Sequence, residues 1–185
     1  YINFFIALYK MDNIEIILYK TIVYPNVKFN SNTFSKIVNN ILKDKRGWEN
    51  HPKAYNGKYV SFLKVQNDFN TKCLKNNCLT IHLVLDKDVQ NICNFIGLSC
   101  YDPNTNHIYI NFNRWMNGSK EFFRDNPKST LKDYRIYVIN HEVGHHLQRG
   151  HKKNCDKKTG KSFVMMQQTK GNVGCKSNHW PLHYE

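Results

Sequence analysis

The chain has 185 residues, of which 41% are hydrophobic and 14% are aromatic. These fractions exclude an intrinsically disordered chain, and the length allows a folded domain with a substantial core. The formal net charge of +13 would suit an acidic partner such as nucleic acid, an anionic glycan or a membrane surface. Because Lys and Asn are abundant throughout the sequence, we interpret the charge as a compositional bias and do not expect nucleic-acid binding.

The first part of the sequence predicts two strands and one helix. Residues 14–23 are rich in β-branched and aromatic side chains, which is typical of a core strand. A helix is expected to start at Asn32 or Thr33 and to end before Gly47. Its apolar stripe consists of Phe34, Ile37, Val38, Ile41 and Leu42. After a polar loop, residues 58–66 form the next predicted strand.

Two further strands follow. Residues 79–85 and 107–112 alternate between the two faces of a strand, with aliphatic side chains on one of them. A small loop that carries Cys93 and Cys100 lies between these strands. The aromatic residues that come next, Trp115, Phe122 and Phe123, are expected in an irregular linker packed under the sheet.

The longest predicted helix starts at Ser129 or Thr130, where Thr130 and Asp133 fit a capping box. One stripe of this helix runs through Leu131, Tyr134, Val138, His141 and His145. The face that buries the helix is therefore expected to carry two histidines into the functional site.

His141, Glu142 and His145 form the motif H-E-x-x-H. Helical residues are about 100° and 1.5 Å apart, so the two histidines share one face, roughly 6 Å apart along the axis. A single Zn²⁺ can accept both imidazoles. Glu142 is rotated by about 100° from His141. It would flank the metal without binding it, where it can accept a proton from a metal-bound water.

His151 is the candidate third ligand. On a continuing helix it would be turned by about 240° from His145, so the chain must leave the helix first. Gly150 suits that exit because glycine takes positive φ without steric cost. Three histidines and a water give the open site of a catalytic zinc, not the closed site of a structural one. The alternative is an amphipathic helix that happens to carry polar histidines.

The six cysteines are Cys73, Cys78, Cys93, Cys100, Cys155 and Cys175. An even number with close neighbours predicts disulfides in an oxidising compartment, although six cysteines allow fifteen connectivities. We expect the pairs Cys73–Cys78, Cys93–Cys100 and Cys155–Cys175. A cysteine-ligated second metal is disfavoured because the sequence has no C-x-x-C pair. No stretch approaches the ~20 apolar residues of a membrane helix, and we expect any signal or anchor to have been removed upstream of Tyr1.

The motif and its surroundings resemble the metzincin clan of zinc metalloproteases, whose pattern is H-E-x-x-H-x-x-G-x-x-H followed by a methionine turn. Residues 164–169 follow the last histidine at a distance that suits such a turn. The glycine of the clan falls at Gln148 in this chain. Either Gln148 takes the left-handed conformation at a cost of about 1 kcal/mol, or the helix runs further and turns at Gly150.

From about residue 27 onward the chain is also similar to an uncharacterised family of secreted bacterial proteins regarded as metzincin-like peptidases. The matching stretches are residues 43–48, 108–115, 134–145, 164–169 and 174–181. The resemblance implies the zinc ligands His141, His145 and His151, the general base Glu142 and the turn methionine Met165. It also implies a metzincin-like α+β fold, with a mixed, mostly parallel twisted sheet of four to five strands packed on two helices.

We therefore expect one catalytic domain over residues 1–185, with an upper lobe at about 1–151 and a small irregular lower lobe at 152–185. The expected function is that of a secreted zinc-dependent endopeptidase. Its extended substrate would pair with residues 107–112 as the edge strand of the sheet. Two alternatives remain, a zinc-binding module without proteolytic activity and a zinc amidase or deacetylase acting on cell-wall or glycan amides. Glu142 argues against the first, because a module that does not catalyse needs no general base.

Overall fold

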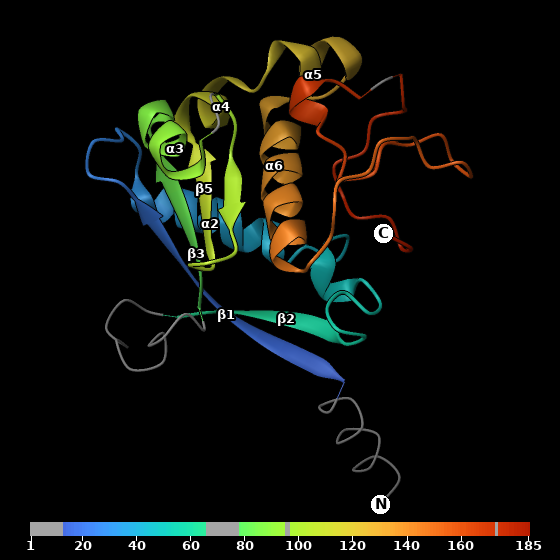
Figure 1. Ribbon diagram of the computed structural model, residues 1–185, viewed down its shortest axis with the longest axis horizontal. Helices are drawn as coiled ribbons and strands as arrows, with labels where there is room; N and C mark the ends of the chain where they lie inside the picture. Colours follow the sequence, from blue (N-terminus) through green and yellow to red (C-terminus); the bar gives the residue numbers. More distant parts are fainter. Residues whose placement is uncertain (1–12, 66–77, 95–96, 173) are drawn as a thin grey trace, which may run out of the picture.

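The computed structural model describes residues 13–65, 78–94, 97–172 and 174–185 in an α+β fold (Figure 1). In this part of the chain a five-stranded sheet has the order β2-β1-β3-β5-β4. Its strands are β1 (Ile14–Val23), β2 (Tyr59–Lys64), β3 (Cys78–Val84), β4 (Cys100–Asp102) and β5 (His107–Asn111). All neighbours pair in parallel except β4, which is antiparallel to β5. The expected mixed, mostly parallel sheet is confirmed.

The edge strand of the sheet differs from the prediction. Residues 107–112 were expected at the edge, but β5 lies between β3 and β4. The chain forms an antiparallel pair in which Tyr101 lies opposite Ile108, so the three-residue β4 becomes the outer strand. A strand of three residues is too short to show a periodic pattern, which is why the sequence did not reveal it.

The described α-helices are α2 (Ser31–Leu42), α3 (Asp86–Cys93), α4 (Phe112–Asn117), α5 (Lys120–Asp125) and α6 (Leu131–His146). The described residues also form two short 3₁₀ turns, η1 (Trp48–Asn50) and η2 (Gln168–Lys170). Helix α2 starts slightly earlier than predicted because Asn30 Oδ1 accepts a hydrogen bond from Thr33 N at 2.8 Å. The capping box of α6 is confirmed, since Thr130 N donates to Asp133 Oδ2 at 2.8 Å.

The irregular linker predicted around Trp115 and Phe122 is wrong, because this segment forms α4 and α5. Each helix starts at a polar cap: Asn111 Oδ1 accepts from Arg114 N, and Ser119 Oγ accepts from Phe122 N, both at 3.1 Å. The two helices are only six residues long. The capping residues therefore mark where these helices start more clearly than an apolar stripe does.

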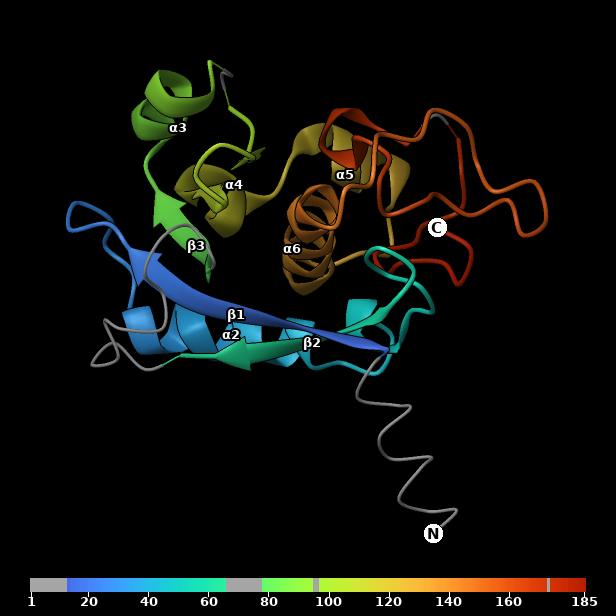
Figure 2. The ribbon, with the colours of Figure 1, turned by 60° about the horizontal axis from the view of Figure 1, so that its bottom comes forward.

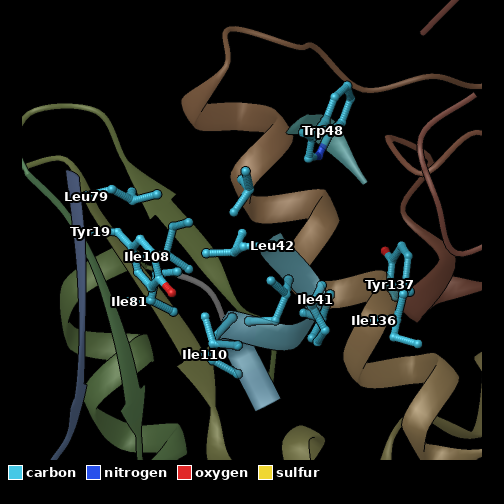
Figure 3. Packing of buried hydrophobic residues seen from close by; sticks show 14 of the residues in the cluster. Tyr19, Ile41, Leu42, Trp48, Leu79, Ile81, Ile108, Ile110, Ile136 and Tyr137 are labelled. Atoms are coloured by element: carbon cyan, nitrogen blue, oxygen red, sulfur yellow. The ribbon is translucent and has the colours of Figure 1, made fainter. Parts of the chain in front are cut away.

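The main core lies between one face of the sheet and helices α2 and α6 (Figure 3). The sheet contributes Ile17, Tyr19, Leu79, Ile81, Leu83, Ile108 and Ile110, and the helices contribute Phe34, Val38, Ile41, Leu42, Tyr137 and Val138, among others. Trp48 is buried in the same core, and its Nε1 donates to the carbonyl oxygen of Asn140 at 3.0 Å. This contact fixes the segment after α2 against the helix that carries the H-E-x-x-H motif.

Two of the three expected disulfides, Cys93–Cys100 and Cys155–Cys175, are formed in the structure. The third expected pair involves Cys73, which lies outside the described residues. Two disulfides suggest an oxidising compartment. Among the described helices, none has both the length and the apolar character that a membrane span requires.

His82 on β3 is expected to make the fold sensitive to acid. Its ring is buried against Tyr109 and His107, and neither of its nitrogens has a hydrogen-bond partner. Burial, together with the nearby charges of His107 and Lys20, lowers the pKa of His82 to about 4. The unfolded chain, with a pKa near 6.5, binds the proton more tightly, so stability is lost as the pH falls from about 6.5 towards 4.

Between pH 7 and pH 4.5, the free energy of unfolding of His82→Phe should fall by about 2 kcal/mol less than that of the wild type. Urea unfolding of both proteins at the two pH values measures this difference. The matched control is His183→Phe, because His183 is exposed near the end of the chain. An equal loss of stability between the two pH values in the wild type and His82→Phe would contradict this assignment.

Candidate metal centre

Three histidines come together at the end of α6. His141 and His145 lie one turn apart on the helix, and His151 follows on the segment after it. One ring nitrogen from each lies within 4.8 Å of the others, and the Nε2 atoms of His145 and His151 are 3.1 Å apart. His141 is buried, His145 is half-buried and His151 is exposed. The cluster could therefore hold a metal ion that is reached from one side.

Backbone carbonyl groups orient the two helical histidines. His141 Nδ1 donates to the carbonyl oxygen of Val164 at 2.8 Å, and His145 Nδ1 donates to that of Arg149 at 2.9 Å. A carbonyl oxygen can only accept, so Nδ1 must carry the proton in both rings and Nε2 keeps its lone pair. Burial lowers the pKa of His141 to about 3 and that of His145 in the same direction. Both rings are therefore neutral at pH 7, as metal ligands must be.

The chain leaves the helix at Gln148 and not at Gly150. Gln148 has φ of 63°, in the left-handed region, whereas Gly150 is not among the residues with positive φ. The backbone N–H of Gln148 donates to the carbonyl oxygen of His145 at 2.9 Å, and that of Arg149 to Gly144 at 2.8 Å. These bonds satisfy the last carbonyl groups of α6 and turn the chain towards His151. Of the two exits that the sequence left open, the left-handed Gln148 is therefore confirmed and the turn at Gly150 is wrong.

Replacing Gln148 by glycine is expected to stabilise the protein by about 0.5–1 kcal/mol. Glycine takes the left-handed conformation without the Cβ clash, and its higher entropy in the unfolded chain offsets part of the gain. The control is Gly150→Ala, since an added Cβ at Gly150 meets no atom within 4 Å and its φ is not left-handed. Urea unfolding curves of both variants test this, and a less stable Gln148→Gly protein would contradict it.

The segment after the third histidine forms a turn that packs under the cluster. Lys152 N donates to the carbonyl oxygen of Met165 at 3.0 Å, and Tyr137 Oη donates to that of Met166 at 3.1 Å. The side chain of Met165 is fully buried. A Cβ added to Gly144 would overlap Met165 Sδ, so the thioether lies against α6 at Gly144, the residue before His145.

Glu185 holds this turn in place, which sequence reasoning missed. Its Oε1 accepts a hydrogen bond from Met165 N at 2.7 Å, and its Oε2 accepts one from Leu182 N at 3.0 Å. The carboxyl group is buried, and burial raises its pKa above the ordinary value for glutamate. The hydrogen bonds from backbone N–H groups oppose this rise and offset only part of it. A single glutamate in a segment without a regular pattern gives no sequence signal for this contact.

A cleft of about 390 Å³ opens beside the histidines. Its lining includes Leu98, Ser99, Cys100, Tyr101 and Pro103 from β4 and its flanks. Gln167, Thr169 and Lys170, in and just before η2, also line it. Helix α6 closes the cleft with Tyr137, Val138, His141, Glu142 and His145. The cleft therefore runs along the edge strand of the sheet and past the three imidazoles.

Glu142 lines the cleft beside the histidines, and its side chain is almost fully buried. Burial raises the pKa of its carboxyl group to about 8. Among the described residues that line the cleft, Glu142 is the only acid. The remaining histidine of the helix, His146, points elsewhere, because its Nδ1 contacts Asn106 Oδ1 at 3.1 Å.

The fold and the site together define an α+β protein with a mixed, mostly parallel sheet and a cleft in which three histidines could bind a metal. The chain belongs to the family described as "Protein of unknown function (DUF3152)", which matches it over residues 17–181. The comparisons with curated proteins and with solved structures found no match. The family match spans all the stretches on which the resemblance to an uncharacterised family rests.

Proposed function

We propose that the protein is a zinc-dependent endopeptidase of the metzincin type. The observation that carries this proposal is the convergence of His141, His145 and His151 on one point, with Glu142 beside them on the wall of an open cleft. The donor set fits zinc, because three neutral imidazoles leave one tetrahedral position open. Met165, which packs against α6 under this cluster, is the proposed turn methionine.

The residues of the cleft would divide the work of hydrolysis. Zinc, when bound, supplies a Lewis acid and lowers the pKa of water. Burial alone raises the pKa of Glu142 to about 8, so its role as a base requires the positive charge of a bound ion nearby, which lowers this pKa again. The ionised Glu142 then accepts a proton from the attacking water and returns it to the leaving nitrogen of the substrate. The carbonyl groups of Val164 and Arg149 keep the rings of His141 and His145 in the tautomer that presents Nε2 to the metal.

An extended peptide is the substrate shape that suits this cleft. Strand β4 is the antiparallel edge of the described sheet and also one wall of the cleft. A peptide could add to this edge as a further strand, with its side chains alternating between the cleft and solvent. Substrate pairing is therefore proposed for residues 100–102, in place of residues 107–112. The zinc amidase or deacetylase remains the second candidate, because an activated water attacks any amide.

The test compares the wild type with Glu142→Gln on an unfolded protein and on glycan amides, with the metal content of both proteins measured. We expect the wild type to cleave the unfolded protein. Glu142→Gln should retain the metal and lose roughly 10²–10⁴-fold in rate, because the amide cannot take the proton. Cleavage of the glycan amides alone would favour the amidase. Equal rates for the two proteins would remove Glu142 from the mechanism.

A further inference from the structure

Lys170 is the only lysine or arginine among the described residues that line the cleft. It is the last residue of η2, and its side chain is exposed. In the described part of the chain no carboxylate forms an ion pair with Lys170, and its Nζ donates to Gln167 Oε1 at 3.4 Å. The cleft therefore contains an ammonium group whose charge is left for a ligand.

The turn that carries Lys170 is held on both sides. The preceding Gln168 is fully buried, and its Nε2 donates to two backbone carbonyl oxygens at 3.1 and 2.9 Å. Asn172 is also fully buried, and its backbone N–H donates to Asp125 Oδ2 at 2.8 Å. Figure 2 shows this orange-red segment beside α5 and α6. The backbone at Lys170 is thus fixed relative to the cleft, which lowers the entropic cost of binding a charged group there.

Gln167 supplies a second donor beside the ammonium group. Its side chain is exposed, and it lines the cleft together with Lys170. Because Gln167 Oε1 accepts from Lys170, the two N–H donors of its Nε2 remain for a ligand. A carboxylate has two oxygens that only accept hydrogen bonds. An ammonium group and an amide N–H, side by side, therefore suit a carboxylate better than a cation or a neutral carbonyl group.

The other charges of the cleft do not compete with this pairing. Glu142, the only acid among the described residues of the lining, is almost fully buried. Burial lowers the pKa of His151, and the charge of Lys170 lowers it further, so the ammonium group lies near the histidine cluster. An extended peptide advances by about 3.3 Å per residue. A carboxylate within a few residues of the bond at the histidines can therefore reach Lys170.

We propose that Lys170, with Gln167 beside it, selects a carboxylate of the substrate close to the scissile bond. The carboxylate belongs to an Asp or Glu side chain of the peptide or to its C-terminus. This inference rests on the proposed function, because it names the kind of peptide that the cleft accepts. Lys170 pairs with a part of the substrate that does not react, so it determines specificity and takes no part in hydrolysis.

The test measures peptide binding by fluorescence anisotropy to zinc-loaded Glu142→Gln, which leaves the peptides uncut. The probe is a labelled peptide of alanine and glutamine with an amidated C-terminus. It is compared with copies in which one glutamine is replaced by glutamate, and with the free-acid form. Lys170→Glu is then added to Glu142→Gln. The matched control adds Lys157→Glu, which changes the net charge equally at an exposed lysine that does not line the cleft.

We expect Glu142→Gln to bind at least one carboxylate-bearing peptide about fivefold more tightly than the amidated parent, the upper range for an exposed ion pair. The added Lys170→Glu should abolish this preference, and the added Lys157→Glu should leave it unchanged. A preference for an internal glutamate identifies an acidic side chain as the source of the carboxylate. A preference for the free-acid form identifies the end of the peptide.

The inference is overturned if Glu142→Gln binds all the peptides equally or binds none of them. A preference that survives Lys170→Glu also overturns it, because the carboxylate would then bind the metal or another cation. Failure of the proposed function gives a different result. A wild type that cleaves none of these peptides, while Glu142→Gln binds the acidic ones through Lys170, would contradict the endopeptidase and support carboxylate recognition.

Discussion

Replacing His145 by alanine is expected to remove metal binding and, with it, any metal-dependent hydrolysis. The Nε2 atom of His145 lies 3.1 Å from that of His151, so both nitrogens are directed at the same point. Without His145 only two imidazoles remain, too few to hold the ion in a tetrahedral catalytic site. Loss of a residue that only hydrogen-bonds to a metal ligand costs roughly 10–100-fold in metal affinity. Loss of a ligand itself is expected to lower the affinity for zinc by more than this. Zinc titration of the purified chain measures this directly.

The neighbouring histidine provides the matched control for that experiment. His146 follows on the same helix, but its ring stacks on Tyr55 and contacts Asn106. His146→Ala is therefore expected to bind one zinc ion per chain with wild-type affinity, although it loses packing. If His145→Ala also bound one ion per chain at wild-type affinity, the three histidines could not be the metal site.

The parts of the fold that the sequence predicted are those with a long periodic pattern. Strand β1 was predicted with its observed bounds, because ten consecutive residues carry the signal. The start of α6 was predicted from the capping box at Thr130 and Asp133. In contrast, α4, α5 and β4 have six residues or fewer, and their positions depend on caps and on pairing with distant strands. Such contacts are not visible in a local pattern.

In the candidate site, too, the sequence predicted the residues that local spacing places and missed those that distant contacts place. Helical geometry alone places His141, Glu142 and His145, because their spacing fixes their directions. The approach of His151 depends on the exit from the helix, which the structure places at Gln148 against the usual preference for glycine. The contact of Glu185 with Met165 spans twenty residues of irregular chain. Long-range contacts of this kind depend on tertiary packing, so only coordinates reveal them.

Gly144 is expected to resist replacement by alanine, although it lies in a helix, where alanine is normally favoured over glycine. An added Cβ would overlap Met165 Sδ and come within 3.1 Å of Trp48 Cζ2. Both neighbours are fully buried, so neither can move away freely. Overpacking of this kind costs about 1–3 kcal/mol, which exceeds the roughly 1 kcal/mol that alanine gains over glycine in a helix.

We therefore expect Gly144→Ala to lower the free energy of unfolding. Because Gly144 directly precedes His145 on α6, we expect the displaced helix to bind zinc more weakly as well. Urea unfolding and zinc titration of the same preparation measure the two effects. The double variant Gly144→Ala/Met165→Ala provides the decisive comparison, because removal of the thioether makes room for the added methyl group. Gly144→Ala should therefore cost less stability in the Met165→Ala background than in the wild type. An equal cost in both backgrounds would show that the thioether does not set the space available at Gly144.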